Sequence, residues 1–200
     1  MKRNLLTLAL LVLSVIAHAQ FVDSFDTNKL GWTEISGSDG DAMIVEGKMH
    51  LEGKKSGISI FGSPSFVETH CYAPFDYTKD FEIKCDAFVK KITDSSSFGI
   101  ILDYIDEGNY IVFLITEKQA ALLRFSEYKL VGRIRANIKL KAQKKANLKL
   151  GIKSSFQKLE FYINDMKSLE CRYLPLHSNG LGFYVSGEQV VEFDELEIHQ

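Results

Sequence analysis

The sequence of 200 residues contains few prolines, few cysteines and a single tryptophan: 3 Pro, 3 Cys and Trp32. The scarcity of proline excludes a collagen-like or proline-rich chain. The scarcity of cysteine excludes a small domain held together mainly by disulfides. A formal net charge of −2 gives no general attraction to nucleic acid or to an anionic membrane surface, so we expect neither as a partner.

Long apolar runs are also missing, apart from one near the start of the chain. The run at residues 5–16 is too short for a membrane-spanning helix. It follows Lys2 and Arg3 and precedes a small-residue triplet, Ala-His-Ala, at residues 17–19. This order predicts a signal peptide cleaved after Ala19. We therefore expect residues 20–200 to be secreted or periplasmic, with no membrane span after signal removal.

The three cysteines are Cys71, Cys85 and Cys171, and an odd number leaves at least one free thiol in an exported protein. Cys85 alternates with apolar residues, which predicts a buried position. Spacing alone does not decide whether Cys71 and Cys171 pair. Phosphate loops, dinucleotide fingerprints and Gly-x-Ser-x-Gly elbows are absent from the sequence, so cofactor chemistry and nucleophilic triads have no support.

The remaining chain shows apolar residues with period two, not 3.6. The alternation is clearest at residues 81–89, 98–104 and 159–163, and turn residues occupy 106–109 and 164–165. Only residues 136–146 have room for a short helix. The pattern predicts one all-β domain over residues 20–200, a two-sheet antiparallel β-sandwich.

The end of the chain contains two further alternating runs, residues 180–187 and 190–198, on either side of a Gly-Glu turn. Short alternating runs joined by a tight turn are typical of a β-hairpin. We expect this hairpin to close the domain.

Several segments carry a family resemblance: Phe21-Val-Asp-Ser-Phe-Asp26, Met43-Ile-Val-Glu-Gly47, Ser97-Phe-Gly-Ile-Ile-Leu-Asp103 and Leu159-Glu-Phe-Tyr-Ile-Asn164. They resemble the concanavalin A-like lectin/glucanase superfamily, most of all its laminin-G-like and family-16-glucanase-like members. The resemblance covers essentially the whole mature chain. It implies a two-sheet jelly roll whose concave sheet often binds a saccharide. It does not imply catalysis, because many members are binding or accessory modules.

One segment resembles a catalytic motif of the retaining β-glucanases in this superfamily. Glu192, Asp194 and Glu197 match a Glu-x-Asp-x-x-Glu strand that supplies nucleophile, assisting aspartate and general acid. Period two places Glu192 and Asp194 on one face, and Glu197 joins them only if the strand contains a β-bulge. The chain ends three residues after Glu197, whereas the glucanase motif lies mid-chain. We therefore favour a structural closing strand over a catalytic one.

A structural calcium ion is a candidate ligand, because calcium prefers carboxylate and carbonyl oxygens. Related sandwiches often hold an ion where the first and last strands meet. Here that would bring Asp23 or Asp26 near Asp194. The alternative is that these are ordinary turn-forming and exposed acids. No other cofactor is expected.

The candidate ligand-binding side chains are those that alternation directs away from the core. Saccharides are commonly bound by an aromatic ring under the pyranose and by polar groups that bond the hydroxyls. The candidates are Phe88, Asp103, Tyr110, Arg124, Tyr162 and Tyr184.

We therefore expect an exported, non-catalytic carbohydrate-binding or interaction module that uses the concave face of a jelly roll. Its expected partner is a glycan or polysaccharide. One alternative is a retaining glycoside hydrolase that uses Glu192, Asp194 and Glu197. Another is a structural cell-envelope or adhesion protein, whose partner would be a second envelope protein.

Overall fold

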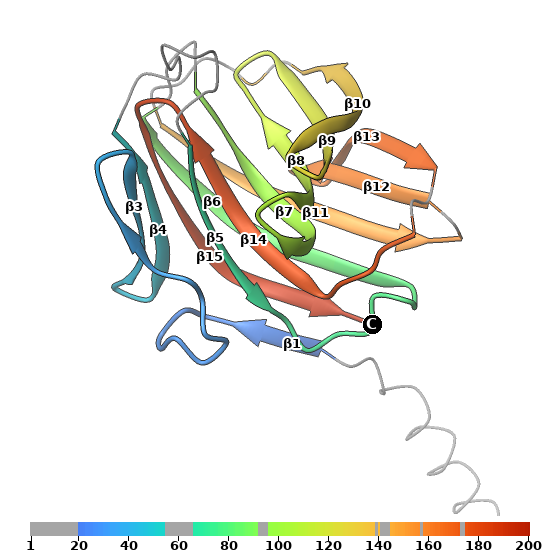
Figure 1. Cartoon of the computed structure of the whole chain (residues 1–200), viewed down its shortest axis with the longest axis horizontal. Helices are drawn as coiled ribbons and strands as arrows, with labels where there is room; N and C mark the ends of the chain where they lie inside the picture. Colours follow the sequence, from blue (N-terminus) through green and yellow to red (C-terminus); the bar gives the residue numbers. More distant parts are fainter. Residues whose placement is uncertain are drawn as a thin grey trace, which may run out of the picture.

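The computed structural model describes residues 20–54, 66–91, 96–138, 140, 145–156, 158–172 and 175–200. Fifteen strands and no helix occur in these residues, and the strands form two antiparallel sheets packed face to face (Figure 1). The predicted all-β two-sheet sandwich is therefore confirmed. The signal peptide predicted at residues 1–19 lies outside the described residues. No helix in the described part of the chain could span a membrane.

The larger sheet has nine strands, and β1 (Gln20–Asp23) joins it by pairing with β15. The other eight lie in the order β13 (Met166–Arg172), β12 (Lys158–Ile163), β11 (Ala146–Ser155), β6 (Phe81–Lys91), β15 (Gln189–His199), β4 (Lys48–Gly53), β3 (Gly40–Val45) and β2 (Ile35–Ser36).

The smaller sheet has six strands, in the order β10 (Lys129–Asn137), β9 (Gln119–Ser126), β8 (Asn109–Ile115), β7 (Ser97–Asp106), β14 (Gly180–Ser186) and β5 (Phe66–Tyr72). Residues 136–146, where the sequence left room for a helix, contribute their first two residues to β10 and their last to β11. Residues 139 and 141–144 of that segment lie outside the described residues.

Local turn chemistry accounts for the hairpins that the sequence predicted. Asn164 and Asp165 connect β12 to β13 with φ angles of 51° and 60°. Two consecutive residues with positive φ match the right-handed twist of the flanking strands, and Asn and Asp tolerate that conformation. Residues 107–108 form the turn between β7 and β8, which pair antiparallel.

Aromatic side chains fill the space between the two sheets. Phe183 of β14 stacks on Phe193 of β15 at 4.1 Å between ring centroids, and Phe113 of β8 meets Phe161 of β12 at 4.8 Å. Trp32 stacks on Phe183 at 5.2 Å and is almost fully buried. Each buried ring contributes roughly 2–3 kcal/mol of apolar transfer free energy. Trp32 thus anchors the N-terminal segment to the core.

The prediction that residues 180–198 form a closing hairpin is wrong. β14 pairs with β5 and β7 in the six-stranded sheet, whereas β15 pairs with β1, β4 and β6 in the nine-stranded sheet. The connection is a corner between the sheets. Gly187 turns it with a φ of 84°, and the buried Gln189 side chain donates to the carbonyls of Ser97 and Ser186. A corner and a hairpin have the same local alternation, because each strand still buries one face.

All three cysteines are buried thiols, and none is in a disulfide. Cys71 lies on β5 of the smaller sheet, while Cys85 and Cys171 lie on β6 and β13 of the larger one. Burial raises the pKa of each thiol above its ordinary value. These cysteines therefore behave as small apolar core residues.

Candidate functional site

The outer side of the six-stranded sheet carries an apolar cluster separate from the core. We call it the tyrosine face and define it by Ile101, Tyr104, Tyr110, Val112 and Tyr184. These side chains are only 0–8% exposed, although they lie on the side of the sheet that faces away from its partner. Such burial outside the core marks a densely packed surface, where aromatic and aliphatic groups cover one another.

Aromatic rings continue from this face in both directions. The Tyr110 ring stacks on Phe125 of β9 at 5.0 Å, and Tyr184 stacks on Phe66 of β5 at 5.6 Å. Phe66 is 43% exposed, so one face of this row of rings remains open to solvent. An open ring face next to buried hydroxyl-bearing rings can stack on the apolar side of a sugar.

Two polar side chains of β5 border the tyrosine face. Glu68 pairs with Tyr184 across the ladder, and His70 stacks on Tyr104 at 3.9 Å between ring centroids. The Oε2 atom of Glu68 and the Nδ1 atom of His70 are buried without a hydrogen-bond partner. Native proteins rarely leave such atoms unpaired, so two of them on one strand face mark a place where a ligand or water can bond.

Electrostatics on this face favour uncharged groups. Burial, reinforced by the nearby Glu107 carboxylate, raises the pKa of Glu68 to about 7. Burial lowers the pKa of His70, although Glu107 opposes that shift. Burial and the Glu68 charge raise the pKa of Tyr104 to about 12. At neutral pH the tyrosines therefore present neutral hydroxyls, and much of Glu68 carries a proton.

An open hollow of about 460 Å³ lies beside Glu68 at the β5 edge of the sheet. Phe66 and Glu68 line it from β5, and Glu107 and Tyr128 line it from the tips of the β7–β8 and β9–β10 hairpins. Tyr128 is 76% exposed. Its backbone N–H donates to the carbonyl of Gly108 at 3.1 Å, which ties the two hairpin tips together.

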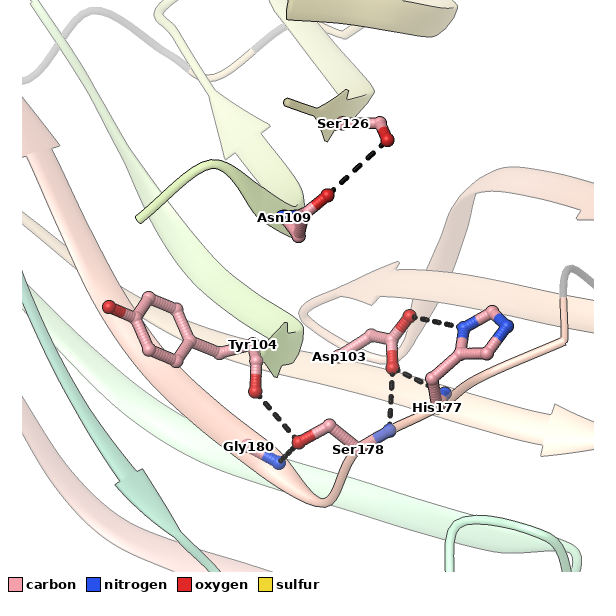
Figure 2. A network of polar contacts seen from close by, with 7 residues as sticks. All are labelled: Asp103, Tyr104, Asn109, Ser126, His177, Ser178 and Gly180. Carbon is pink, nitrogen blue, oxygen red and sulfur yellow. Dashed lines mark hydrogen bonds and ion pairs between the residues drawn. The ribbon is translucent and has the colours of Figure 1, made fainter. Parts of the chain in front are cut away.

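A second, smaller hollow of about 210 Å³ brings together three of the residues predicted from sequence: Asp103, Tyr110 and Arg124. Its wall also contains His177, which precedes β14. Figure 2 shows the Asp103 carboxylate directed at the backbone of His177 and Ser178, with the His177 ring beside it.

Comparison with known proteins bears on this architecture. No protein-family model matches the sequence, and no curated protein matches it either. Among solved structures, a legume lectin-like domain from Entamoeba histolytica superposes with a TM-score of 0.62 at 14% identity, covering 84% of this chain and 89% of that one. The Bacillus licheniformis β-glucanase superposes with a TM-score of 0.61 at 8% identity, covering 92% and 99%.

The fold is the concanavalin A-like jelly roll. A third match, the GH43B protein of a Bacteroides ovatus xyloglucan PUL, has a TM-score of 0.56 at 18% identity. It covers 88% of this chain, which spans 38% of the length of that protein. Identities this low establish the concanavalin A-like fold and carry no function with them.

The remaining predicted ligand-binding residues lie on the opposite side of this jelly roll. Phe88 of β6 and Tyr162 of β12 are half-buried on the outer side of the nine-stranded sheet. The Lys48 ammonium lies 4.4 Å from the centroid of the Phe88 ring. Tyr162 lines a polar hollow of about 520 Å³ and donates its hydroxyl to Glu160 at 2.8 Å. Four of the six candidates therefore divide between the two outer faces of the sandwich. Arg124 was predicted to face away from the core, but it pairs across the ladder with Ile111 of the core, so it lies on the inner side of β9, where Asp103 lines the same hollow.

The Glu192, Asp194 and Glu197 segment contains the β-bulge that the motif requires. The register of β15 against β6 shifts between Asp194 and Glu197, with Glu195 at a φ of 48°. Glu192, however, forms ion pairs with Lys48 and Lys90, and His50 lies beside it. Burial would raise the pKa of Glu192, but the hydrogen bond from Lys90 and the charges of Lys90 and Lys48 outweigh burial and lower it. The trio lies on the outer side of the nine-stranded sheet, away from the tyrosine face.

The predicted calcium ligands are engaged in local contacts. The Asp23 carboxylate accepts hydrogen bonds from the Trp32 indole at 2.9 Å and from the Phe25 N–H at 3.0 Å. Asp26 accepts from the Ser24 hydroxyl, and Asp194 accepts from the Glu195 N–H. Within the described residues, no group of three or more His, Cys, Asp or Glu side chains is arranged to hold a metal ion.

Sequence reasoning missed Glu68 and His70. The segment Phe66-Val-Glu-Thr-His-Cys-Tyr72 alternates strictly, with Val67, Thr69 and Cys71 buried toward the core. That alternation was available in the sequence and would have placed Glu68 and His70 together on the outer side of a strand. The neighbouring tyrosines, Tyr104, Tyr110 and Tyr184, come from β7, β8 and β14, which lie much later in the chain than β5.

Proposed function

We propose that the protein is an exported, non-catalytic carbohydrate-binding module that holds a saccharide on the tyrosine face. The observation that carries the proposal is the pairing of a packed aromatic surface with the two unpartnered polar atoms of Glu68 and His70. Stacking on rings and hydrogen bonding to hydroxyls are the two interactions that sugar recognition needs. The signal peptide predicted at residues 1–19 and the lectin-like and glucanase-like folds support this proposal.

Isothermal titration with xyloglucan, laminarin and mixed-linkage β-glucan oligosaccharides tests it. Phe66→Ala should weaken the affinity for the bound oligosaccharide about tenfold, because one stacking contact contributes roughly 1 kcal/mol or more. Phe156→Ala is the matched control, since Phe156 is 89% exposed in the β11–β12 turn, away from the tyrosine face. Equal losses in the two variants, or no binding to any of the three sugars, would contradict the proposal.

A second candidate function, glycoside hydrolysis, is favoured by one observation on the same face. Glu68 has its pKa raised to about 7 by burial and by Glu107, and both carboxyls line the 460 Å³ hollow. A carboxyl with a raised pKa can act as general acid beside a second carboxyl that acts as base or nucleophile. In this case Glu68 would be the general acid, and Glu107 the base or nucleophile.

A reducing-sugar assay distinguishes hydrolysis by Glu68 and Glu107 from saccharide binding without catalysis. It also distinguishes it from hydrolysis by Glu192, Asp194 and Glu197. Hydrolysis by the tyrosine face predicts activity that falls at least about 100-fold in both Glu68→Gln and Glu107→Gln. Glu192→Gln should then retain full activity, because Glu192 lies on the nine-stranded sheet, away from the tyrosine face, and its carboxylate is bonded to Lys90 of the same sheet. Absence of release from all three sugars would eliminate hydrolysis of these substrates and leave the binding function standing.

A further inference from the structure

The hollow of about 460 Å³ at the β5 edge continues the tyrosine face. Glu68 pairs with Tyr184 across the β5–β14 ladder, so both side chains project from the same side of the sheet. Phe66, two residues before Glu68, projects from that side too, and its ring stacks on Tyr184 at 5.6 Å. Phe66 and Glu68 both line the hollow. A saccharide on the tyrosine face would therefore reach the hollow at this edge.

Two exposed aromatic rings border the hollow, one from the sheet and one from a hairpin tip. Phe66 is 43% exposed and Tyr128 is 76% exposed. Tyr128 lies in the turn between β9 and β10, where Glu127 and Tyr128 have φ angles of 51° and 63°. This conformation favours glycine or asparagine, so a tyrosine there costs conformational energy. The turn thus presents a large ring at a position that backbone preference does not explain.

Contacts between the two hairpin tips hold Tyr128 in place. Its N–H donates to the Gly108 carbonyl at 3.1 Å, and a Cβ atom at Gly108 would lie 3.1 Å from two atoms of the Tyr128 ring. The glycine therefore leaves room for the ring. The Asn109 side chain accepts from the Ser126 hydroxyl at 3.3 Å (Figure 2) and from the Glu127 N–H at 3.2 Å. This wall of the hollow is therefore preformed.

The hollow is acidic, and none of the residues that line it is a lysine, arginine or histidine. Its acidic residues are Asp39, Glu68 and Glu107. The Oε2 atom of Glu68 is buried without a hydrogen-bond partner. Burial and the Glu107 charge raise the pKa of Glu68 to about 7. A ligand cation in the hollow would offset the repulsion between these two carboxyls and favour the charged form of Glu68.

The other titratable groups around Glu68 are neutral at pH 7. Burial lowers the pKa of His70, against the opposing effect of Glu107. Burial raises the pKa of each neighbouring tyrosine that the Glu68 charge also affects, namely Tyr104, Tyr110 and Tyr184. These groups supply no positive charge to Glu68, so the missing cation has to come from a ligand.

An organic ammonium group suits the hollow better than a metal ion does. Within the residues that the structure describes, no group of three or more His, Cys, Asp or Glu side chains is arranged to hold a metal ion. An ammonium group needs fewer carboxyls, because its N–H groups donate to them while aromatic ring faces attract its charge. The hollow offers both kinds of contact.

We propose that the hollow is a subsite for an amino sugar, in which the carboxyls of Glu68 and Glu107 bind the ammonium group. The ring of that sugar contacts Phe66 and Tyr128. The proposal rests on the proposed function, since the rest of the saccharide lies on the tyrosine face. It adds that the preferred ligand is a polysaccharide with free amino groups.

Chitosan and cellulose oligosaccharides of equal length are matched probes. They share the β-1,4-linked backbone, and an amino group in one replaces a hydroxyl of the other on each sugar. At about pH 6, where such amines are largely protonated, the mature protein should bind the chitosan oligosaccharide at least about tenfold more tightly in isothermal titration. Added salt should reduce this ratio, because it screens the charges.

Glu107→Gln should bring the ratio close to one, because it removes a carboxylate from the hollow and keeps the shape of the side chain. Tyr128→Ala should weaken the binding of the chitosan oligosaccharide about threefold or more. The control is Glu127→Gln, which removes the same charge from an exposed residue that does not line the hollow and should keep the ratio. Circular dichroism melting confirms that each variant folds.

Proton release on binding gives an independent measurement. An ammonium group beside Glu68 favours its carboxylate form, so Glu68 should lose its proton when the chitosan oligosaccharide binds. Titrations at about pH 6 in two buffers of different ionisation enthalpy count the protons released. The natural protein should release more protons than Glu68→Gln does, and equal release would contradict contact between Glu68 and the ammonium group.

Other outcomes would also overturn the subsite. Equal affinity for the two probes, or an equal loss of the ratio in Glu107→Gln and Glu127→Gln, would remove the role of the hollow. Oligolysine that binds as tightly as the chitosan oligosaccharide would reduce the hollow to a general cation site. Binding of a neutral β-glucan without preference for the amino sugar would contradict the subsite alone. Failure of every sugar to bind would contradict the proposed function as well.

Discussion

Glu68 is the residue at which the tyrosine face departs furthest from ordinary surface chemistry. A carboxyl on the outer side of a sheet normally ionises near pH 4.5, but burial and Glu107 raise the pKa of Glu68 to about 7. Above pH 4.5 the unfolded chain loses this proton, whereas the folded protein keeps it until about pH 7. The folded state therefore binds more protons in this window, and the free energy of unfolding falls as the pH rises through it.

The expected loss is about 3 kcal/mol between pH 4.5 and pH 7.5, from the linkage between pKa and stability. Glu68→Gln should remove this contribution, so the variant should match the natural protein at pH 4.5 and exceed it in stability at pH 7.5. Urea unfolding of both proteins at the two pH values measures the difference. Parallel pH dependences in the two proteins would show that Glu68 is not the titrating group.

Asp23 illustrates a buried acid whose role is structural. Asp23→Ala leaves the Trp32 indole N–H and the Phe25 N–H without their acceptor, and should destabilise the protein by about 2–4 kcal/mol in urea unfolding. Asp26→Ala, at an exposed position, is the control and should cost less than about 1 kcal/mol of unfolding free energy.

Calcium should leave the melting temperature of the natural protein unchanged. A clear rise in the melting temperature would instead favour an ion at Asp23.

Strand β7 shows how an element can depend on the absence of a side chain. Gly99 lies between Tyr184 of β14 and Leu114 of β8 in the ladder. A Cβ atom at Gly99 would overlap the carbonyl oxygen of Phe113, so the backbone of β8 would have to move. Close approach of neighbouring strands thus supports the floor of the tyrosine face.

Gly99→Ala should therefore lower the free energy of unfolding by about 3 kcal/mol or more. Gly132→Ala on β10 is the matched control, because its added Cβ would lie 3.5 Å from the Cβ of Arg124, an ordinary van der Waals distance. That variant should change stability by less than about 1 kcal/mol. Thermal melting followed by circular dichroism compares them, and equal effects would contradict the steric argument.

Strands are also the scale at which sequence and structure agree best. The alternation at residues 81–89 and 159–163 reappears as β6 and β12, because each strand must bury one face against the opposite sheet. The β15 bulge, required for Glu192 and Glu197 to share a face, is present. The final corner was predicted as a hairpin because local alternation does not record which sheet a strand joins.

At the scale of the whole molecule, the candidate site depends on strand order. Tyr110 and Tyr184 were predicted to face away from the core, and both lie on the tyrosine face. Phe88 and Tyr162 were predicted by the same rule but lie on the other sheet. Alternation separates inside from outside, but it cannot distinguish the two outsides of a sandwich. For the same reason, Glu68 and His70 join the tyrosines only through the pairing of β5 with β14.

The central claim is that a saccharide binds on the tyrosine face. The most direct test is a nuclear magnetic resonance titration of the ¹⁵N-labelled mature protein with the oligosaccharide that binds best in calorimetry. We predict that the largest amide shifts map to β5, β14, β8 and β9, with Glu68, His70 and Tyr184 among them. Shifts confined to the outer side of the nine-stranded sheet, around Phe88 and Tyr162, would contradict the account.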